Sequence, residues 1–329
     1  MTKRHLEGEA VRAGGFASPR TFSSMMSRMA GLLGLFVLLA LSSPAFLRSQ
    51  NLINVLRQAS LLTILSCGMT LVILTGGIDL SVGAVATLSS CMTANLFRVG
   101  QPGSSVLLGV ATALLVGALC GLVNGLMVAK VKLPPFIATF GMMQVARGCS
   151  LLLIGGNIIY GFRRDFRFLG AGVIGGIPVP IMIAAAVVGV IWFISRKTVF
   201  GRSVYATGAN KRAAMLSGVH VDRALVQVYV LNGVIAAFTG LLYVARLNAA
   251  EPGFGDQLQL QAIAATVMGG AAMTGGRGDV TGTAVGALIM MMIINGMNLN
   301  GISSLWQQAL TGAIIICAVL AETLSQRRK

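Results

Sequence analysis

The sequence predicts an all-α, polytopic bundle of membrane helices, and two observations carry that prediction. Of the 329 residues, 55% are hydrophobic and only 10% are charged, whereas soluble domains carry about 25% charged residues. Several apolar runs also approach or exceed the ~18 residues that mark a membrane-spanning helix. We therefore expect about ten transmembrane helices, at residues 29–47, 54–75, 81–97, 105–129, 134–154, 177–195, 223–246, 258–274, 280–297 and 303–323.

Both ends of the chain are expected on the cytoplasmic side (N-in/C-in). An even number of crossings places the termini on one face, and Lys and Arg accumulate in cytoplasmic segments. With the termini inside, 17 of the 25 basic residues lie in cytoplasmic segments and 7 in external ones, and Arg147 remains within a crossing. The chain then divides into a cytoplasmic N-terminal tail at 1–28, a transmembrane domain at 29–324 and a basic C-terminal tail at 325–329.

The charge and the motif inventory exclude several classes of function. The net charge of +16 does not indicate nucleic-acid binding, because the basic residues lie between apolar runs instead of forming one patch. The five cysteines are far apart, so neither a metal site nor a disulfide is expected. No His, Asp and Glu set has catalytic or metal-binding spacing, and no G-x-x-x-x-G-K-[ST] phosphate loop occurs. We therefore expect no enzymatic activity and no ATP hydrolysis by this chain.

Two sets of glycines recur at every fourth position. Small residues at this spacing share one helix face and let helices approach closely in lipid. We expect tight helix contacts at both sets, which are Gly117, Gly121 and Gly125, and Gly278, Gly282 and Gly286.

A long polar segment, residues 196–222, interrupts the apolar chain and contains its own helix signals. Asn210 is a favourable N-cap, the residues 211–217 can form two turns, and Gly218 suits the left-handed position that ends a helix. A helix this short is not stable in isolation. A connection of this length is also more than a plain link requires, so we expect it to pack against another structure.

Four stretches together resemble one family. They are "GMTLVILTGGIDLSVGAVATLS" (68–89), "PPFIATFGMMQVARG" (134–148), "GRSVYATGANKRAAMLSGVHV" (201–221) and "QAIAATVMGGAAMTGGRGDVTGTAVGALI" (261–289). They resemble the permease subunits of bacterial ATP-binding-cassette (ABC) importers for monosaccharides, the ribose/xylose/galactose-type family. Their order and spacing over most of the chain make the resemblance specific.

The resemblance implies a ten-helix permease domain in the bacterial inner membrane that works as a dimer. The second permease would be another copy or a paralogue. A cytoplasmic ABC ATPase, which binds the ATP and Mg²⁺, would dock beneath it, and an extracytoplasmic sugar-binding protein would dock above it; no cofactor is expected in this chain. The segment 196–222 would then contain the helix that couples the ATPase to transport. Its coupling residues would be Gly201, Arg202, Gly208, Asn210, Ala213, Ala214 and Gly218.

Asp79 and Ser81 are candidates for the substrate path, because polar residues inside membrane segments are costly and commonly functional. Gly76 and Gly77 precede them and allow the backbone to leave a helical conformation. One alternative is a broken helix whose backbone lines the path or a gate. The other is a tight turn at the membrane face, with Asp79 capping the next helix.

Five further polar residues lie inside the expected crossings or directly beside one. Arg147 can pair with an acid, extend toward the membrane surface or bind sugar hydroxyl groups. The others are uncharged hydrogen-bonding groups that suit a neutral polyhydroxylated cargo, and hydrogen bonding between helices is the alternative for each. They are Asn124, Gln144, Asn295 and Asn298.

Two other functions fit parts of the pattern. A branched-chain amino acid-type ABC permease shares the general architecture, but a zwitterion requires paired charges, and only Asp79 and Arg147 are clear intramembrane candidates. An ion-coupled secondary transporter requires no coupling helix. Co-purification with an ATPase would separate it from both importers. The sequence does not identify the sugar, because initial selection belongs to the binding protein.

The chain departs from the family pattern at two places. Gln259 and Gln261 stand in "QLQAIA", where related permeases often carry acidic residues, and Lys211 and Arg212 follow Asn210, where an acidic residue is usual. Glutamine keeps the hydrogen-bonding capacity of glutamate without its charge. The departures are explained either by drift in a self-pairing permease or by pairing with a different permease that retains the acidic residues.

The orientation yields the first testable prediction. Alkaline phosphatase is active only outside the cytoplasm, so fusions after residues 100, 165 and 253 should be active. Fusions after residues 130, 210 and 329 should be inactive. Activity of the fusion after residue 210 would contradict both the orientation and the cytoplasmic position of the segment 196–222.

Overall fold

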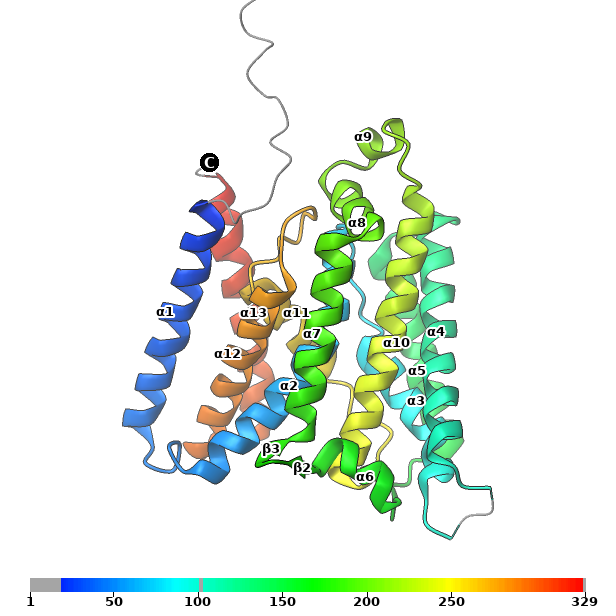
Figure 1. Ribbon diagram of the computed structural model, residues 1–329, viewed down its shortest axis with the longest axis vertical. Helices are drawn as coiled ribbons and strands as arrows, with labels where there is room; N and C mark the ends of the chain where they lie inside the picture. The colour runs from blue at the N-terminus through cyan, green and yellow to red at the C-terminus, as the bar shows by residue number, and fades with distance from the viewer. Residues whose placement is uncertain (1–18, 101–102, 328–329) are drawn as a thin grey trace, which may run out of the picture.

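The computed structural model describes residues 19–100 and 103–327 (Figure 1). These residues form thirteen helices and four two-residue strands, so the predicted all-α, polytopic class is confirmed. The helices are α1 (Pro19–Ser42), α2 (Ser49–Leu74), α3 (Val82–Phe97), α4 (Val106–Ala129), α5 (Pro135–Ile154), α6 (Arg164–Ala171), α7 (Val179–Lys197), α8 (Val199–Ala209), α9 (Lys211–Leu216), α10 (Val221–Leu247), α11 (Leu258–Met268), α12 (Val280–Leu299) and α13 (Ser304–Arg327). The strands are β1 (Ile159–Tyr160), β2 (Val173–Ile174), β3 (Ile177–Pro178) and β4 (Ala249–Ala250).

Six of these helices are long and apolar enough to cross a membrane: α2, α4, α5, α7, α10 and α12. Four shorter apolar helices accompany them, in α1, α3, α11 and α13. Each expected crossing overlaps one of the ten. The expected crossing at 258–274 differs most from the structure, because α11 has 11 residues and is about 16 Å long at 1.5 Å per residue. This length is about half the thickness of the ~30 Å hydrocarbon core of a bilayer.

The two ends of the bundle differ in what they carry. The beginning of α1, the end of α13, α8 and α9 lie at one end (Figure 1). The opposite end carries α6 and the strands, which pair as β1 with β4 and β2 with β3, both antiparallel. We call the second end the α6 end. Both ends of the described chain therefore lie on the side of α9.

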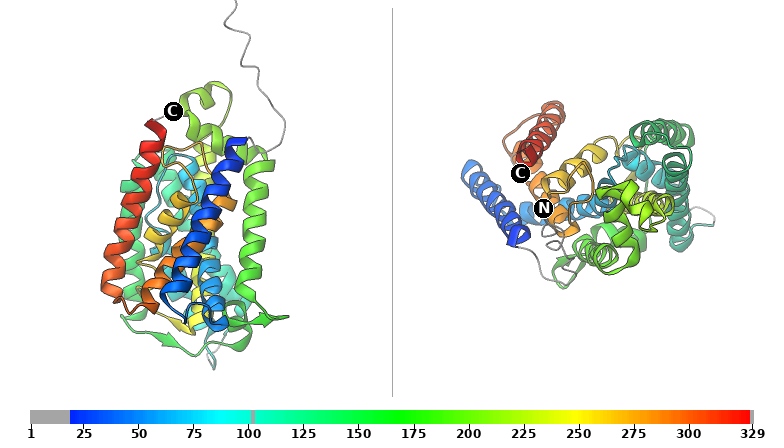
Figure 2. Two further views of the ribbon diagram at one scale, coloured as in Figure 1. Left: turned by 90° about the vertical axis from the view of Figure 1, so that its left-hand side faces the viewer. Right: turned by 90° about the horizontal axis from the view of Figure 1, so that it is seen from above.

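Helices α2 and α10 form the buried centre of the bundle. α10 packs on α4, α3 and α2, and α2 also contacts α12 and α7. Side chains of α2 between Leu61 and Leu74 are almost completely buried, as is Tyr229 of α10. The remaining helices surround this pair, and α13 and the α4–α5 pair project to the same side with α11 between them (Figure 2, right). We call this surface the α5–α13 face.

Glycines bring α4 and α10 into backbone contact. A Cβ atom on Gly117 would overlap the carbonyl oxygen of Gly233, and a Cβ atom on Gly233 would overlap the carbonyl oxygen of Gly117. Gly121 meets the backbone of Tyr229 in the same way. The expected tight contact of the Gly117 set is therefore found against α10. In the second set, Gly282 and Gly286 lie against the backbone of Gly269 and Ala265.

The chain interrupts its helices twice inside the bundle. α2 ends at Leu74 with Gly76 at a φ of +76°, and residues 75–81 run as non-helical chain from the level of α8 to the start of α3 (Figure 1). Residues 251–257 similarly lead into the short α11. The second interruption meets the first turn of α3, because the backbones of Gly83 and Gly255 leave no room for a Cβ on either residue.

The Gly117–Gly233 contact yields a stability prediction. Gly117→Val forces a side chain against the α10 backbone, and overpacking of this kind costs about 1–3 kcal/mol. We expect a lower thermal denaturation temperature in detergent, measured by fluorescence-detected size-exclusion chromatography. Gly189→Val on α7 is the control, because a Cβ atom there meets nothing within 4 Å. Equal stability of the two variants would contradict the packing described for α4 and α10.

Candidate functional site

Asp79 lies in the first interruption and is only 2% exposed. Its Oδ1 accepts hydrogen bonds from the backbone N of Ser81 at 2.8 Å and from the Ser81 hydroxyl at 2.6 Å. Its Oδ2 accepts from Nδ2 of Asn232 on α10 at 2.8 Å. Asn124 of α4 donates from Nδ2 to the Ser81 hydroxyl at 2.9 Å. These four residues join α3, α4 and α10, and we call them the Asp79 network.

The backbone beside Asp79 is satisfied by α5. The N–H of Leu80 donates to Oγ1 of Thr139 at 3.1 Å, and the same hydroxyl lies 3.3 Å from the carbonyl oxygen of Ile78. Ser81 occupies the N-cap position of α3, but its hydroxyl bonds to Asp79 and not to the helix. The bond from Asp79 to the residue before α3 is a feature of the turn alternative, and the position of the segment is a feature of the broken-helix alternative. The turn lies in the interior of the bundle and not at the membrane face.

Arg147 pairs with an acid, one of the three alternatives considered for it. Its Nη2 lies 3.0 Å from Oδ2 of Asp256, and the two side chains are 52% and 40% exposed. Arg147 comes from α5 and Asp256 from the loop before α11. One turn along, Nε2 of Gln259 lies 3.3 Å from Sδ of Met143. The pair and this contact connect α5 with α11 on the α5–α13 face.

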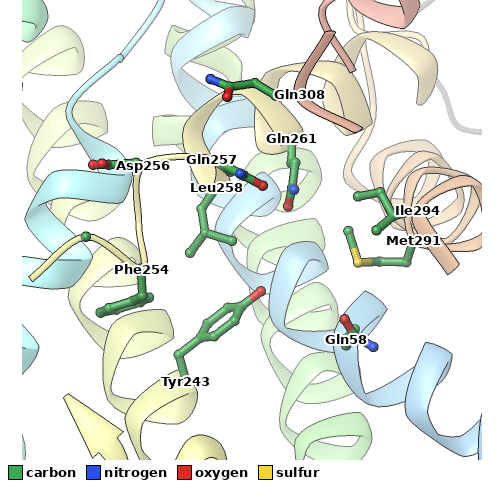
Figure 3. A pocket seen from close by; sticks show the side chains of 11 residues that line it. Gln58, Tyr243, Phe254, Asp256, Gln257, Leu258, Gln261, Met291, Ile294 and Gln308 are labelled. Carbon is green, nitrogen blue, oxygen red and sulfur yellow. The ribbon is translucent and has the colours of Figure 1, made fainter. Parts of the chain in front are cut away.

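A cavity of about 530 Å³ opens beside this pair. It lies between α2, α10, α11, α12 and α13, and Figure 3 shows the Gln261 amide and the Tyr243 hydroxyl pointing into the same space. The lining residues are Gln58, Tyr243, Gly253, Phe254, Asp256, Gln257, Leu258, Gln261, Met291, Ile294 and Gln308.

The remaining polar candidates lie apart from the cavity. Asn295 exchanges two hydrogen bonds with Asn51 of α2, at 3.1 and 2.8 Å. Asn298 accepts from Nε2 of Gln307 at 2.7 Å. Both asparagines therefore match the alternative of hydrogen bonding between helices. Gln144 is exposed on α5.

The end of the bundle at α9 holds the expected coupling residues. Asn210 caps α9 through Oδ1, which accepts from the N–H of Ala213 at 3.0 Å, and Gly218 has a φ of +80°. Both helix signals read from the sequence are confirmed. Arg202 and Ala213 are exposed. Met215 and Leu216 present the largest apolar surfaces of α9, at 56% and 84% exposed.

Three coupling candidates face inward. Gly201 packs against the backbone of Ser195, and Gly208 packs against the carbonyl oxygen of Leu74 at the end of α2. The side chain of Ala214 is buried in an apolar cluster with residues of α4 and α10. These three residues connect the segment to the bundle, so a partner on this surface would contact Arg202, Ala213, Met215 and Leu216.

The α6 end is basic. Arg164 and Arg167 are exposed on α6, and Phe166 on the opposite side of this helix stacks on Phe97 with ring centroids 3.9 Å apart. Arg163 donates to Asp165, and this hydrogen bond lowers the pKa of the Asp165 carboxyl below its usual value. Within the described part of the chain, Arg164 and Arg167 on the outer surface of α6 form no ion pair.

Several residues of these sites were not predicted from the sequence. Asn232 is one, although a polar residue in the middle of an apolar run is itself a signal. The cavity residues Gln58, Tyr243 and Gln308 are others. They come from three helices that are far apart in the sequence, so no local spacing could have grouped them.

Comparison with known proteins places the chain in a family. The family described as "Branched-chain amino acid transport system / permease component" matches residues 51–319. The ribose import permease protein RbsC of Bacillus subtilis is 41% identical, over 92% of this chain and 94% of that protein. The chain belongs to this family of ABC-importer permeases. It is accordingly a multi-pass protein of the inner membrane, and the family recognised from the four stretches is confirmed.

Other relatives carry the names of sugar permeases as well. The D-allose transport system permease protein AlsC of Escherichia coli is 37% identical, over 87% of each chain. The fructose import permease protein FrcC of Rhizobium meliloti is 37% identical, over 80% of this chain and 75% of that protein. No solved structure matched the chain.

The Asp79 network yields a prediction for the permease. Asp79→Asn places an NH₂ group where an oxygen accepts from Ser81 or from Asn232, and an unpaired buried polar group costs about 1–3 kcal/mol. We expect a lower denaturation temperature in detergent. Exchanging the two residues, as Asp79→Asn with Asn232→Asp, restores one amide and one carboxylate and should recover stability.

Asp165→Asn is the matched control, because Asp165 is exposed and its ion pair with Arg163 lies on the surface, where such pairs contribute little. An Asp79→Asn variant as stable as this control would contradict the network. Failure of the exchange to recover any stability would contradict the direct pairing of Asp79 with Asn232.

Proposed function

We propose that this chain is the permease subunit of an ATP-driven importer and forms the translocation path for a monosaccharide. The observation that carries the proposal is the similarity along nearly the whole chain to proteins named as ribose, allose and fructose permeases. A pentose or hexose delivered by an extracytoplasmic binding protein is the cargo. The permease itself hydrolyses no ATP, which is the task of a separate ABC ATPase.

The α5–α13 face is the proposed path, completed by a second permease in a dimer. Polar side chains are exposed on it at membrane depth, among them Gln144 and Arg147 of α5 and Gln308 of α13. Polar groups at this depth are costly when they face lipid. A second permease copy facing this surface would remove them from lipid and enclose an aqueous passage between the two chains.

The α9 end is the proposed contact with the ATPase, which makes it the cytoplasmic end and makes the chain a ten-crossing protein with both termini inside. Met215 and Leu216 would enter an apolar groove of the ATPase. Lys211 and Arg212 at the start of α9 favour an acidic rim on that groove, because charge complementarity selects partners. Movement of α9 would reach α2 through the contact of Gly208 with Leu74.

The α6 end is the proposed contact with the binding protein. Arg164 and Arg167 are exposed there, and cations at an interface select an acidic partner and speed its encounter. The apolar side of α6 is fixed on Phe97 by the stacked Phe166. A rigid basic surface therefore faces the side from which the cargo arrives.

The two alternatives receive less support. The family description names branched-chain amino acids, but Arg147 and Asp256 satisfy one another, which leaves no charged pair for a zwitterion. An ion-coupled transporter would not require the exposed apolar tip of α9.

Reconstitution tests the proposal. This chain as the only permease, with its ATPase and binding protein in liposomes, should take up labelled D-ribose, D-allose or D-fructose only when ATP is present. Changing both Met215→Asp and Leu216→Asp should reduce this uptake at least tenfold, roughly the effect of losing 1.4 kcal/mol of interaction. Leu47→Asp at the opposite end, where the side chain is 51% exposed, is the control.

Three results would revise the proposal. Uptake driven by an ion gradient without ATP would contradict it. Normal uptake by the Met215 and Leu216 variant would exclude α9 as the ATPase contact. Uptake that requires a sister permease, or the change Gln259→Glu, would replace the self-paired dimer by one of two different permeases.

A further inference from the structure

The cavity beside Arg147 and Asp256 has the size and position of a ligand site. Its volume of about 530 Å³ lies within the ~300–1,000 Å³ typical of small-molecule sites. Tyr243 lies one turn from the end of α10, and Gln58 lies in the first half of α2 (Figure 3). Both positions place the cavity in the half of the bundle nearer the α6 end, the side from which cargo would arrive.

Four glutamine side chains line this cavity: Gln58, Gln257, Gln261 and Gln308. Gln261 is only 9% exposed. Among residues 19–100 and 103–327, no hydrogen bond joins any of the four amides to another protein group. Gln58 is partly buried, and Gln257 and Gln308 are exposed, so water reaches these three amides. A nearly buried amide without a protein partner is uncommon, and Gln261 therefore indicates that a polar molecule occupies this space.

The amides also define the chemistry of that occupant. A primary amide presents a carbonyl acceptor and two N–H donors, and a hydroxyl group both donates and accepts. Each glutamine can therefore donate a hydrogen bond to a hydroxyl oxygen or accept one from a hydroxyl hydrogen. An occupant with several hydroxyl groups can bond to Gln261 and to a neighbouring amide, and no formal charge is required.

The other wall of the cavity is apolar. The rings of Tyr243 and Phe254 lie with centroids 5.7 Å apart and a tilt of 32°, and Leu258, Met291 and Ile294 continue this wall. A monosaccharide has C–H faces that pack on such a surface while its hydroxyl groups point to the amides. The Tyr243 hydroxyl adds a further donor and acceptor at the edge of the same space (Figure 3).

Charge separates this occupant from an amino acid. Asp256 is the one charged residue among the described lining residues of the cavity. Its Oδ2 forms an ion pair with Nη2 of Arg147 at 3.0 Å. A zwitterion placed there would find no free cation for its carboxylate among the described lining residues. We propose that the glutamine-lined cavity is a transient binding site for an uncharged monosaccharide in the outer half of the permease, an assignment that rests on the sugar import proposed above.

Protection of a cysteine from labelling tests the site directly. The complex is prepared with Cys149→Ala and Cys317→Ala, because these two cysteines are exposed, and with Gln261→Cys in the cavity. A small methanethiosulfonate reagent added from outside should label this position. D-Ribose, D-allose or D-fructose at millimolar concentration should slow the labelling at least threefold, whereas L-leucine at the same concentration should leave the rate unchanged.

Gln50→Cys is the matched control. Gln50 lies two turns before Gln58 on α2 and is exposed outside the cavity, so its labelling rate should not respond to any sugar. Equal protection of both positions would overturn the proposal, because the sugar would then act away from the cavity. Protection of Gln261→Cys by L-leucine and not by any of the sugars would also overturn it.

A transport measurement separates this site from the proposed function as a whole. Gln261→Leu keeps the size of the side chain and removes its hydrogen bonds, so sugar uptake should fall about tenfold, the effect of one lost hydrogen bond of about 1.4 kcal/mol. ATP hydrolysis stimulated by the loaded binding protein should persist, and Gln50→Leu should transport normally. Normal uptake by Gln261→Leu would exclude the site and leave the importer intact, whereas no sugar uptake by the unmodified complex would contradict the importer itself.

Discussion

The absence of water in the hydrocarbon core is the constraint on which this fold depends. Every backbone N–H and C=O that leaves a helix there must find a partner within the protein. The chain leaves its helices at residues 75–81, and it satisfies the exposed groups with side chains from elsewhere. Asp79 accepts from the N–H of Ser81, and Thr139 of α5 accepts from the N–H of Leu80. An interruption of this kind is stable only where α4, α5 and α10 already surround it.

The second interruption also borders the cavity. α11 has only 11 residues, and the chain that leads into it is irregular. Phe254, Asp256 and Gln257 of that irregular segment line the cavity. A continuous helix would have filled this volume with regular side chains. Gly83 in the first turn of α3 is in backbone contact with Gly255 of this irregular segment, so displacement of one is transmitted to the other.

The α9 end and the interior of the bundle are connected through the end of α2. The carbonyl oxygen of Leu74 accepts from the N–H of Gly276 at 2.9 Å and touches Gly208 of α8. Five residues further on lies Asp79. Tyr205 of α8 donates to the carbonyl oxygen of Gly278 at 2.9 Å, in the same loop as Gly276. A shift of α8 therefore acts on the start of the first interruption and on the loop that precedes α12.

Local patterns in the sequence were sufficient for the helices and the caps. The apolar runs predicted the helical bundle, and Asn210 and Gly218 predicted the beginning and end of α9. The expected crossing at 258–274 was too long, because the residues after Met268 are small and apolar but fold as a loop in which Gly270 and Gly275 have positive φ values. Hydropathy does not distinguish such a loop from a helix. The cavity was not predictable, because its glutamines are brought together by packing between helices.

Gln259 shows how the charge balance of the α5–α13 face bears on the choice of permease partner. It lies on α11 one turn after Asp256 and contacts Met143 of α5, one turn before Arg147. A glutamate at this position would bring a second carboxylate to a face where one arginine already has its counter-charge, and an excess charge at membrane depth is costly. Glutamine leaves Arg147 and Asp256 as a balanced pair within one chain. This balance favours a permease that pairs with its own copy, because neither chain requires a neutralising charge from a different partner.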